Sequence, residues 1–318
     1  MPLYLIKRMI SMLYVLIGVT IIVFLMIHLI PGDTAQTLLG GEATKASLDA
    51  LRHKMGLDQP LIIQYFIWIK QVITGNLGYS YSLHINISHL LFPRFLNTLV
   101  LTIASLLLSI LIGVGLGFFS GLKKNTVIDK ILSALSVFGA SMPVFWIALM
   151  LMWLFAIQLR LLPVSGMYNL RGNGGFADLL MHLILPTIAT SLVSIAVISQ
   201  MTRNVVSDVV NKDYINYYQS FGLSHYQLNM KHILRNSLPP VINIIGLQVG
   251  YILGGALFSE IVFNWPGVGL AIYTAINSKD YPMIQAGVLF IALSFVLVNF
   301  VVDILNIVVN PKLRDSNK

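Results

Sequence analysis

The chain contains no cysteine, and this absence excludes disulfide bonds, thiolate metal sites and thiol catalysis. Charged residues are also scarce, because they make up only 10% of the 318 residues. A soluble domain carries about a quarter charged residues. Hydrophobic residues make up 57% of the chain and the mean hydropathy is +0.82. We therefore expect most of the protein surface to face lipid.

The sequence also lacks the motifs of an ATPase or a hydrolase. No Gly-Lys pair occurs, so the chain has no P-loop to hold ATP phosphates. No serine, histidine and acid gather in one loop, and no pair of acids lies within an apolar run. We therefore expect no catalysis and no cofactor in this chain, so that energy comes from a partner chain or an ion gradient.

Six apolar runs are long enough to cross a bilayer, which requires about 20 residues in a helix. They predict an all-α integral membrane protein with spans at residues 9–30, 96–119, 131–157, 180–201, 241–259 and 283–309. The first run follows Lys7 and Arg8, but it is too long for a signal peptide and no cleavage site follows it. The last run contains Asp303, for which we expect a structural role in pairing with Arg203, Arg235 or a partner protein.

Lysine and arginine are concentrated in alternate loops, which sets the orientation. The short loops on one side hold only Arg160, Arg171 and Lys279, and the loops on the other side hold more basic residues. Both termini are therefore expected in the cytoplasm. The same distribution argues against nucleic-acid binding, although the net charge is +8.

The first loop, residues 31–95, is expected outside and to contain short helices. Leu48, Leu51 and Met55 follow a helical spacing. The apolar run that begins at Leu61 stops at Lys70 and is too short to cross. These patterns predict a small external subdomain between the first two spans.

The loop at residues 202–240 is too long for a simple turn. It predicts two short helices with a break at Gly222, an N-cap at Ser224, and an end at Pro239 and Pro240. From the residues alone, two interpretations stay open. The loop is either a rigid docking element for a partner protein or an amphipathic connector resting on lipid headgroups.

At this loop the sequence resembles a known family. The runs at residues 213–224 and 232–240 are similar to the coupling loop of the dipeptide, oligopeptide and nickel permeases, which are type I ABC importers. The chain looks like the first of their two permease subunits. Further resemblance, covering nearly the whole chain, lies at residues 31–33, 56–61, 64–65, 75–78, 141–146, 260–269 and 280–285.

The resemblance implies a bacterial plasma (inner) membrane protein with a transport core at residues 96–309. It implies a heterodimer with a second homologous permease, two ATP-binding subunits that bind ATP and Mg, and an extracytoplasmic solute-binding protein. Solutes of the family include dipeptides, oligopeptides, glutathione and nickel or other metal chelates. The sequences of the spans do not indicate which of these solutes is transported. The rival interpretation, a secondary carrier or channel without an ATPase, predicts inverted repeats and several buried ions, which the sequence does not display.

The resemblance also implies which residues contact the ATP-binding subunit. They are Asp213, Tyr214, Tyr218, Ser220, Phe221, Gly222, Leu223, Arg235 and Asn236. The family usually has small residues at positions 218 and 220 and a basic one at position 221. We therefore expect the partner surface to accommodate Tyr218, and the ATP-binding subunit to be a dedicated one.

The loop at residues 260–282 resembles an external gate that faces the solute-binding protein. Its candidates are Glu260, Trp265, Pro266 and Gly267. From the residues alone, an aromatic followed by a Pro-Gly turn is also ordinary in any hairpin between spans. Two amides in the fifth predicted span either line the solute path or bond neighbouring helices, namely Asn243 and Gln248.

Small residues recur at four-residue spacing in two predicted spans. These positions predict close helix packing and are Gly113, Gly117, Gly121, Gly246, Gly250 and Gly254. In the first loop, His84 and His89 lie five residues apart without a third ligand, so we expect no metal site there.

Overall fold

The computed structural model describes residues 2–29, 44–55, 58–80, 82–169 and 174–309. The described chain is helical apart from one two-stranded hairpin. Its elements are α1 (Pro2–Leu29), α3 (Lys45–Met55), α4 (Leu61–Ile73), β1 (Tyr79–Ser80), β2 (Ile85–Asn86), α5 (Ile87–Leu122), α6 (Val127–Ala140), α7 (Val144–Leu151), the π-helix η1 (Met152–Gln158), α8 (Phe176–Val210), α9 (Asp213–Ser220), α10 (His225–Gln227), the π-helix η2 (Leu228–Leu234), α11 (Arg235–Val262), α12 (Val268–Asn277) and α13 (Tyr281–Val309). The short helices expected in the first loop are confirmed as α3 and α4.

Among the residues that the structure describes, five helices are long and apolar enough to cross a membrane, and the number rises to six if one bent helix pair counts as a span. The bent pair corrects the prediction of a single span at 131–157, because α6 and the α7–η1 run meet at 101°. The break falls at Ser141–Pro143. Proline lacks an N–H group and disfavours helical backbone in the residue before it, so α6 ends there.

The prediction that Pro239 and Pro240 end a helix is wrong, since both lie inside α11. The helical backbone continues from His225 to Val262, well before the predicted span start at residue 241. Prolines within a long apolar helix are tolerated where neighbouring groups satisfy the freed carbonyls. The π-helical turn η2 immediately before α11 shows that the backbone hydrogen bonding is already adjusted in this stretch.

Contacts divide the chain into two units, which comprise residues 1–97 with 266–296, and residues 98–265 with 297–318. In the first unit α4 packs on α1, where the Tyr65 hydroxyl lies 2.8 Å from Thr20 Oγ1 and the Phe24 ring contacts the rings of Tyr65 and Trp68. A separate core joins the start of α5 to α12 and α13. It consists of Ile87, Leu91, Val268, Ala271, Ala275, Met283 and Ala286.

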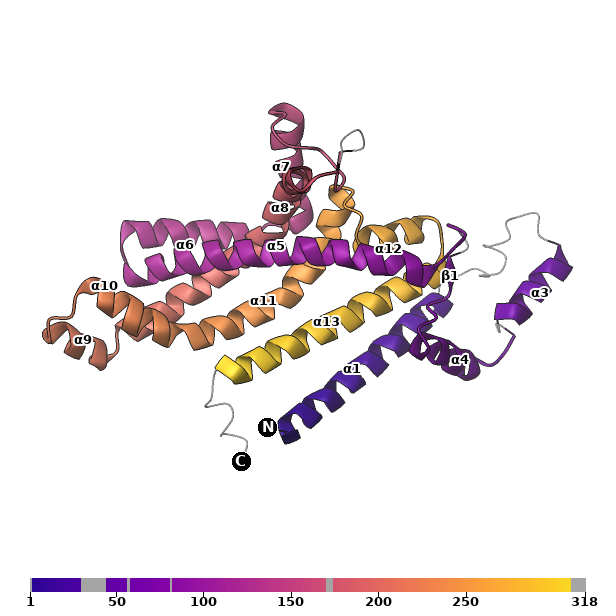
Figure 1. Ribbon diagram of the computed structural model, residues 1–318, viewed down its shortest axis with the longest axis horizontal. Coiled ribbons are helices and arrows are strands. Elements are labelled where there is room, and N and C mark those ends of the chain that lie inside the picture. The colour runs from indigo at the N-terminus through magenta and orange to yellow at the C-terminus, as the bar shows by residue number, and fades with distance from the viewer. Residues whose placement is uncertain (1, 30–43, 56–57, 81, 170–173, 310–318) are drawn as a thin grey trace. The chain divides into compact units, whose positions relative to one another are not determined.

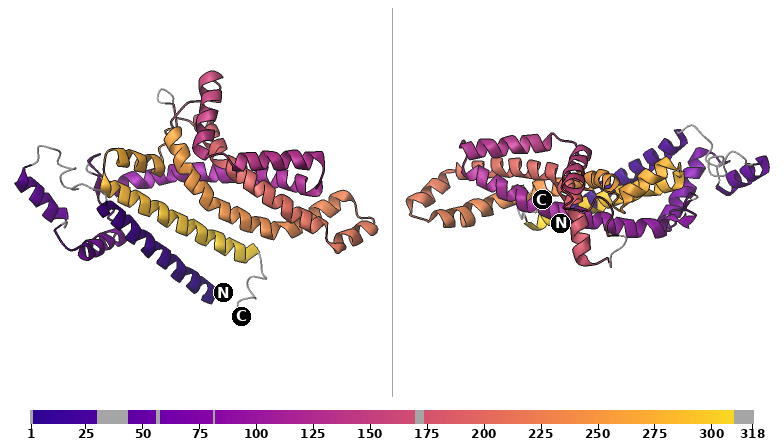
Figure 2. Two further views of the ribbon diagram at one scale, coloured as in Figure 1. Left: turned by 180° about the vertical axis from the view of Figure 1, so that it is seen from behind. Right: turned by 90° about the horizontal axis from the view of Figure 1, so that it is seen from above.

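The second unit is a helix bundle in which α5, α6, α8 and α11 run side by side (Figures 1 and 2). The predicted packing role of three glycines on α5 is confirmed. A Cβ atom added to Gly113, Gly117 or Gly121 would lie within 3 Å of α8 atoms, the nearest side-chain atoms belonging to Ile198, Thr202 and Val206. Other positions of α5 expose Ile103, Leu107 and Leu111. Thus α5 approaches α8 closely and offers apolar side chains to lipid or to another subunit.

The second predicted glycine face receives less support, because a Cβ atom at Gly254 of α11 would meet no atom within 4 Å. Gly254 is exposed, while the adjacent Gly255 is buried and faces Val144 and Thr190. The packed small-residue position near that end of α11 is therefore one residue later than the four-residue spacing predicts.

The glycine contact gives a direct stability prediction. We expect Gly117→Ala to be less stable than Gly115→Ala by about 1–3 kcal/mol, since the first methyl group must displace the backbone or Thr202 of α8. Thermal unfolding of the detergent-solubilised variants measures this difference. Gly115 is the matched control on the same helix, because its added Cβ atom meets nothing within 4 Å. Equal unfolding temperatures for the two variants would contradict the close approach.

Candidate functional site

The predicted coupling loop folds into a helical hairpin formed by α9, a turn, α10 and η2, here called the helical hairpin 213–234. The turn is confirmed where the sequence placed it, because Gly222 has φ +75° and α9 ends at Ser220. The restart is also confirmed, since the Gln227 N–H donates to Ser224 Oγ at 3.3 Å. Figure 1 shows this hairpin at the end of α8 and α11.

A buried apolar cluster anchors the helical hairpin 213–234 to the bundle. From the hairpin, Ile215, Leu228 and Ile233 are at most 2% exposed. They pack with Phe118 of α5 and with Val206 and Val209 of α8. The hairpin is therefore held by side-chain packing on two long helices, which makes it a firm projection of the second unit.

Two of the predicted docking aromatics face this anchor. Tyr214 and Tyr218 are half-buried against the cluster, and the Tyr218 ring lies 4.2 Å from the His232 ring between centroids. The Tyr214 hydroxyl accepts a hydrogen bond from Asn236 Nδ2 at 3.3 Å. The chain's own His232 therefore covers part of Tyr218, and the accommodation of the rest of this side chain by a partner stays a prediction.

Other aromatics form the exposed face of the hairpin. Tyr217, Phe221 and Tyr226 are 60%, 66% and 75% exposed, and the rings of Tyr217 and Phe221 lie 4.5 Å apart. The predicted coupling residues did not include Tyr217 and Tyr226. For Tyr217 the signal was present in its four-residue spacing from Phe221, which puts both side chains on one helical face.

The remaining predicted coupling residues lie around this face. Leu223 is half-buried, and the others are exposed, namely Asp213, Ser220, Gly222, Arg235 and Asn236. The Ser220 hydroxyl donates to the Asn216 carbonyl within α9. The hairpin thus presents polar and charged side chains around an aromatic patch, as protein interfaces commonly do.

The predicted gate residues at the end of α11 are buried. Glu260 is 0% exposed, and its Oε1 accepts a hydrogen bond from Thr98 Oγ1 at 2.6 Å. Its main-chain carbonyl accepts from the Trp265 N–H at 2.9 Å. Trp265 is also 0% exposed and packs with Leu101 and Ala256. These two side chains therefore form part of the interior and do not present an open external surface.

The rest of this loop belongs to the first unit. The Pro266 carbonyl accepts a hydrogen bond from Asn97 Nδ2 at 2.9 Å, and Gly267 is the N-cap of α12. Asp280, which sequence reasoning noted only as part of a motif, is 1% exposed. Its Oδ2 accepts from the hydroxyls of Ser80 and Ser82, each at 2.6 Å, and from the Ser82 N–H.

Asp280 therefore joins the β1–β2 hairpin to the start of α13, because its Oδ1 also accepts from the Met283 N–H at 3.2 Å. These four donors are uncharged. A buried carboxylate requires such hydrogen bonds, since its desolvation is costly without them. Sequence reasoning missed this contact because the partners lie about 200 residues apart.

The polar residues predicted within the spans lie in different environments. Asn243 and Gln248 of α11 are half-buried, and Gln248 Oε1 has no hydrogen-bond partner among the described residues. Asp303 lies in α13, but its side chain is outside the described residues. Arg203 forms a salt bridge with Asp129, and the expected pairing of Asp303 stays a prediction.

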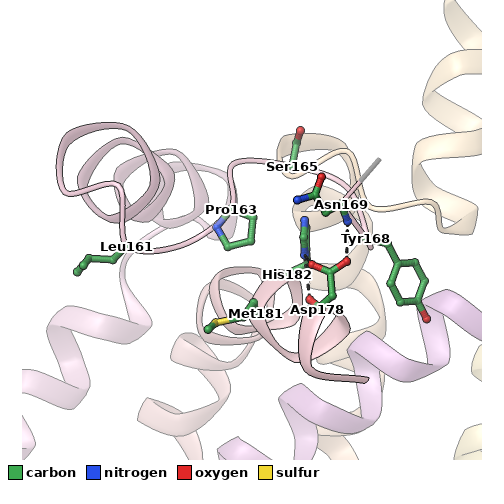
Figure 3. Close-up of a pocket in the computed structure, with 8 residues that line it drawn as sticks. All are labelled: Leu161, Pro163, Ser165, Tyr168, Asn169, Asp178, Met181 and His182. Carbon is green, nitrogen blue, oxygen red and sulfur yellow. Dashed lines mark hydrogen bonds and ion pairs between the residues drawn. The ribbon is translucent and has the colours of Figure 1, made fainter. Parts of the chain in front are cut away.

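A cleft of about 580 Å³ lies at the other end of α8 (Figure 3). Its polar wall contains Asp178, whose carboxylate accepts from the Asn169 N–H at 2.7 Å and lies 3.3 Å from His182 Nδ1. Figure 3 shows these groups turned toward one another, and His182 Nδ1 also lies 2.9 Å from the main-chain oxygen of Asp178. The two histidines considered for metal binding, His84 and His89, are exposed at the β1–β2 turn and in α5.

A model of the family described as "binding-protein-dependent transport system inner membrane component" matches residues 113–315, and a model of the corresponding N-terminal membrane component matches residues 1–102. The chain belongs to this family. It is accordingly a type I ABC importer permease subunit, a multi-pass inner membrane protein and a non-catalytic transport component.

Similar proteins cover nearly the whole chain. The dipeptide transport system permease protein DppB of Alkalihalophilus pseudofirmus is 38% identical, with 98% of this chain and 99% of the relative aligned. The glutathione transport system permease protein GsiC of Salmonella choleraesuis is 37% identical, with 98% of each aligned. The di/tripeptide transport system permease protein DppB of Pseudomonas aeruginosa is 37% identical over 93% of this chain and 94% of the relative.

Family membership argues against the rival carrier or channel that works without an ATPase. The family implies an importer with a partner permease, an ATP-binding component and a binding protein. The helical hairpin 213–234 lies within the matched family region, as do Glu260 and Trp265.

The turn at Gly222 yields a testable distinction between backbone and side-chain effects. A Cβ atom at Gly222 meets no atom within 4 Å, so only the left-handed backbone opposes a substitution. We expect Gly222→Ala to cost about 1–2 kcal/mol of local stability. Hydrogen exchange of the α9 amides measures this change.

Gly222→Asn is the matched variant, because asparagine adopts the left-handed region more readily than alanine. We expect its α9 amides to exchange more slowly than those of Gly222→Ala. An alanine variant with protection equal to that of the parent chain would show that the turn does not depend on glycine.

Proposed function

We propose that this chain forms half of the translocation pathway of an ATP-driven importer for peptides or peptide-like solutes such as glutathione. The observation that carries the proposal is the 37–38% identity, over nearly the whole chain, to permeases named for dipeptide and glutathione transport. Peptide length and the exact solute are selected chiefly by the solute-binding protein, as in the resembling family. Nickel and metal chelates are less favoured as solutes, because none of the three relatives described above is named for them.

The helical hairpin 213–234 docks on an ATP-binding subunit in this proposal. The exposed aromatic patch of Tyr217, Phe221 and Tyr226 supports docking, since aromatic side chains are enriched in protein interfaces. The anchoring cluster beneath the patch supports a mechanical role, because force on a firmly packed projection reaches the helices that hold it. The anchoring cluster also makes the alternative, an amphipathic connector resting on lipid headgroups, less favoured.

The complete transporter then contains this chain, a second homologous permease, two ATP-binding subunits and a solute-binding protein. Both termini lie in the cytoplasm in this arrangement, and the hairpin lies on the same side. Loaded binding protein docks on the opposite side, and ATP-driven closure of the ATP-binding subunits changes which side of the pathway is open.

Affinity purification of the tagged chain, co-expressed with its neighbouring genes, tests this assembly. We expect two ATP-binding subunits and one second permease to co-purify. Alanine substitution of Tyr217, Phe221 and Tyr226 together is expected to reduce the retained ATP-binding subunit by about tenfold or more, because buried aromatic anchors often contribute over 2 kcal/mol each to binding.

Tyr273→Ala is the matched control, since Tyr273 is an exposed aromatic on α12 outside the hairpin. We expect this variant to retain the ATP-binding subunit at the parent level. Solute uptake by the purified chain alone, without any ATP-binding partner, would overturn the proposed function.

The buried carboxylate of Glu260 provides a second test of the proposed function. We expect Glu260→Gln to lower both solute uptake and solute-stimulated ATP hydrolysis by about tenfold, since the neutral amide removes a charge from a buried position that already accepts the Thr98 hydroxyl. Uptake and ATP hydrolysis are measured in reconstituted liposomes. Thr98→Val keeps the carboxylate and is expected to have a smaller effect. Parent-level uptake and hydrolysis in Glu260→Gln would remove Glu260 from the pathway assignment.

A further inference from the structure

A buried ion pair lies between α6 and α8 in the second unit. Arg203 Nε and Nη2 donate to the two carboxylate oxygens of Asp129, at 2.5 and 2.6 Å. The Asp129 side chain is 1% exposed and that of Arg203 is 21% exposed. A paired, two-point contact of this kind fixes the orientation of both groups as well as their distance.

The same carboxylate also binds the end of α5. The Ser120 hydroxyl donates to Asp129 Oδ1, and the Asn125 N–H in the α5–α6 turn donates to Asp129 Oδ2 at 2.9 Å. One side chain therefore connects three helices, α5, α6 and α8. The sequence separation between Asp129 and Arg203 is 74 residues, so no local pattern predicts the pair.

Stability alone does not account for this arrangement. A buried ion pair often contributes little net free energy of folding, because the cost of desolvating both charges offsets their attraction. The surrounding packing already holds α5 against α8 at Gly117 and Gly121. The α6 helix already packs along α8, and the ion pair adds a fixed two-point connection at the first turn of α6.

Arg203 lies close in sequence to the helical hairpin 213–234 and to the residues that anchor it. Arg203 lies on α8, which continues without a break to Val210, shortly before α9 begins. Between Arg203 and the hairpin, Val206 and Val209 belong to the cluster that anchors the hairpin. A displacement of the hairpin therefore acts on the stretch of α8 that carries Arg203.

Asp129 lies on α6, which is the first helix of the bent pair. Asp129 lies in the first turn of α6, whose other end meets the break at Ser141–Pro143 before α7. The α6 helix packs along α8 over its length (Figure 2). A pull on the first turn of α6 is thus directed along the helix toward the 101° bend.

We infer that Asp129 and Arg203 are a positioning pair that transmits displacement of the helical hairpin 213–234 to α6 and its bend. The inference rests on the proposed function, in which an ATP-binding subunit moves the hairpin. Asp129 and Arg203 contact neither the solute nor ATP in this role. They set how much hairpin movement reaches the spans.

The test compares the number of solute molecules taken up per ATP hydrolysed by the complete reconstituted transporter. We expect Asp129→Asn to assemble at the parent level and to hydrolyse ATP, but to lower this ratio by about tenfold, within the range typical of coupling between sites. Lys130→Gln is the matched control, because Lys130 is the next residue of α6, is exposed, and should leave the ratio unchanged. A normal ratio in Asp129→Asn would overturn the inference.

If Asp129→Asn reduces assembly, two further variants test the same ratio of solute to ATP. Ser120→Ala removes one hydrogen bond without changing charge and is expected to lower the ratio about twofold to threefold, whereas an unchanged ratio would count against the connection. In the cysteine-free chain, Asp129→Cys with Arg203→Cys allows a short bifunctional thiol reagent to replace the ion pair covalently. Cross-linking should restore the ratio, and a cross-linked transporter that stays uncoupled would overturn the inference.

These measurements also separate the inference from the proposed function. If the parent chain fails to bind an ATP-binding subunit, the proposed function itself fails. If the parent complex transports solute and the Asp129 and Ser120 variants do so with the same ratio, only the role of the ion pair fails.

Discussion

The second unit depends on the close approach of α5 and α8. Glycine at positions 113, 117 and 121 leaves the α5 side of the contact without side chains, and Ile198, Thr202 and Val206 of α8 occupy the space. In a membrane, lipid tails are as apolar as leucine, so helices associate through such tight packing and through hydrogen bonds. The contact leaves one face of α5 free to expose Ile103, Leu107 and Leu111.

Two further features build on that contact. At one end of α8, Phe118, Val206 and Val209 provide the apolar surface on which the helical hairpin 213–234 packs. Close by, Ser120 of α5 and Arg203 of α8 meet at Asp129. A shift between α5 and α8 would disturb both the hairpin anchor and the ion pair, which is why the glycine contact constrains the candidate functional elements.

Local patterns in the sequence predicted much of this fold. Runs of apolar residues identify the membrane-crossing helices, because the bilayer thickness fixes their length. The break at Gly222 and the N-cap at Ser224 were also predictable, since each depends on the conformation or hydrogen bonding of its immediate neighbours. The family resemblance rests on such contiguous motifs, and the family models confirm it.

Features that depend on distant residues were not predictable in this way. No local pattern in the sequence predicts the contact of Tyr218 with His232 or the hydrogen bond from Thr98 to Glu260. The salt bridge from Arg203 to Asp129 could not be told from one to Asp303 by charge alone. Pro239 and Pro240 suggested a helix end, but the tertiary setting of α11 overrides this local preference.

The bond from Asp280 to Ser80 and Ser82 has a consequence for the order of synthesis. A ribosome makes the chain from its N-terminus, so the β1–β2 hairpin exists long before residue 280 does. The buried carboxylate also caps the start of α13 through the Met283 N–H. The hairpin therefore reaches its final hydrogen bonding only when the last helix begins to form, and early and late parts of the nascent protein are completed together.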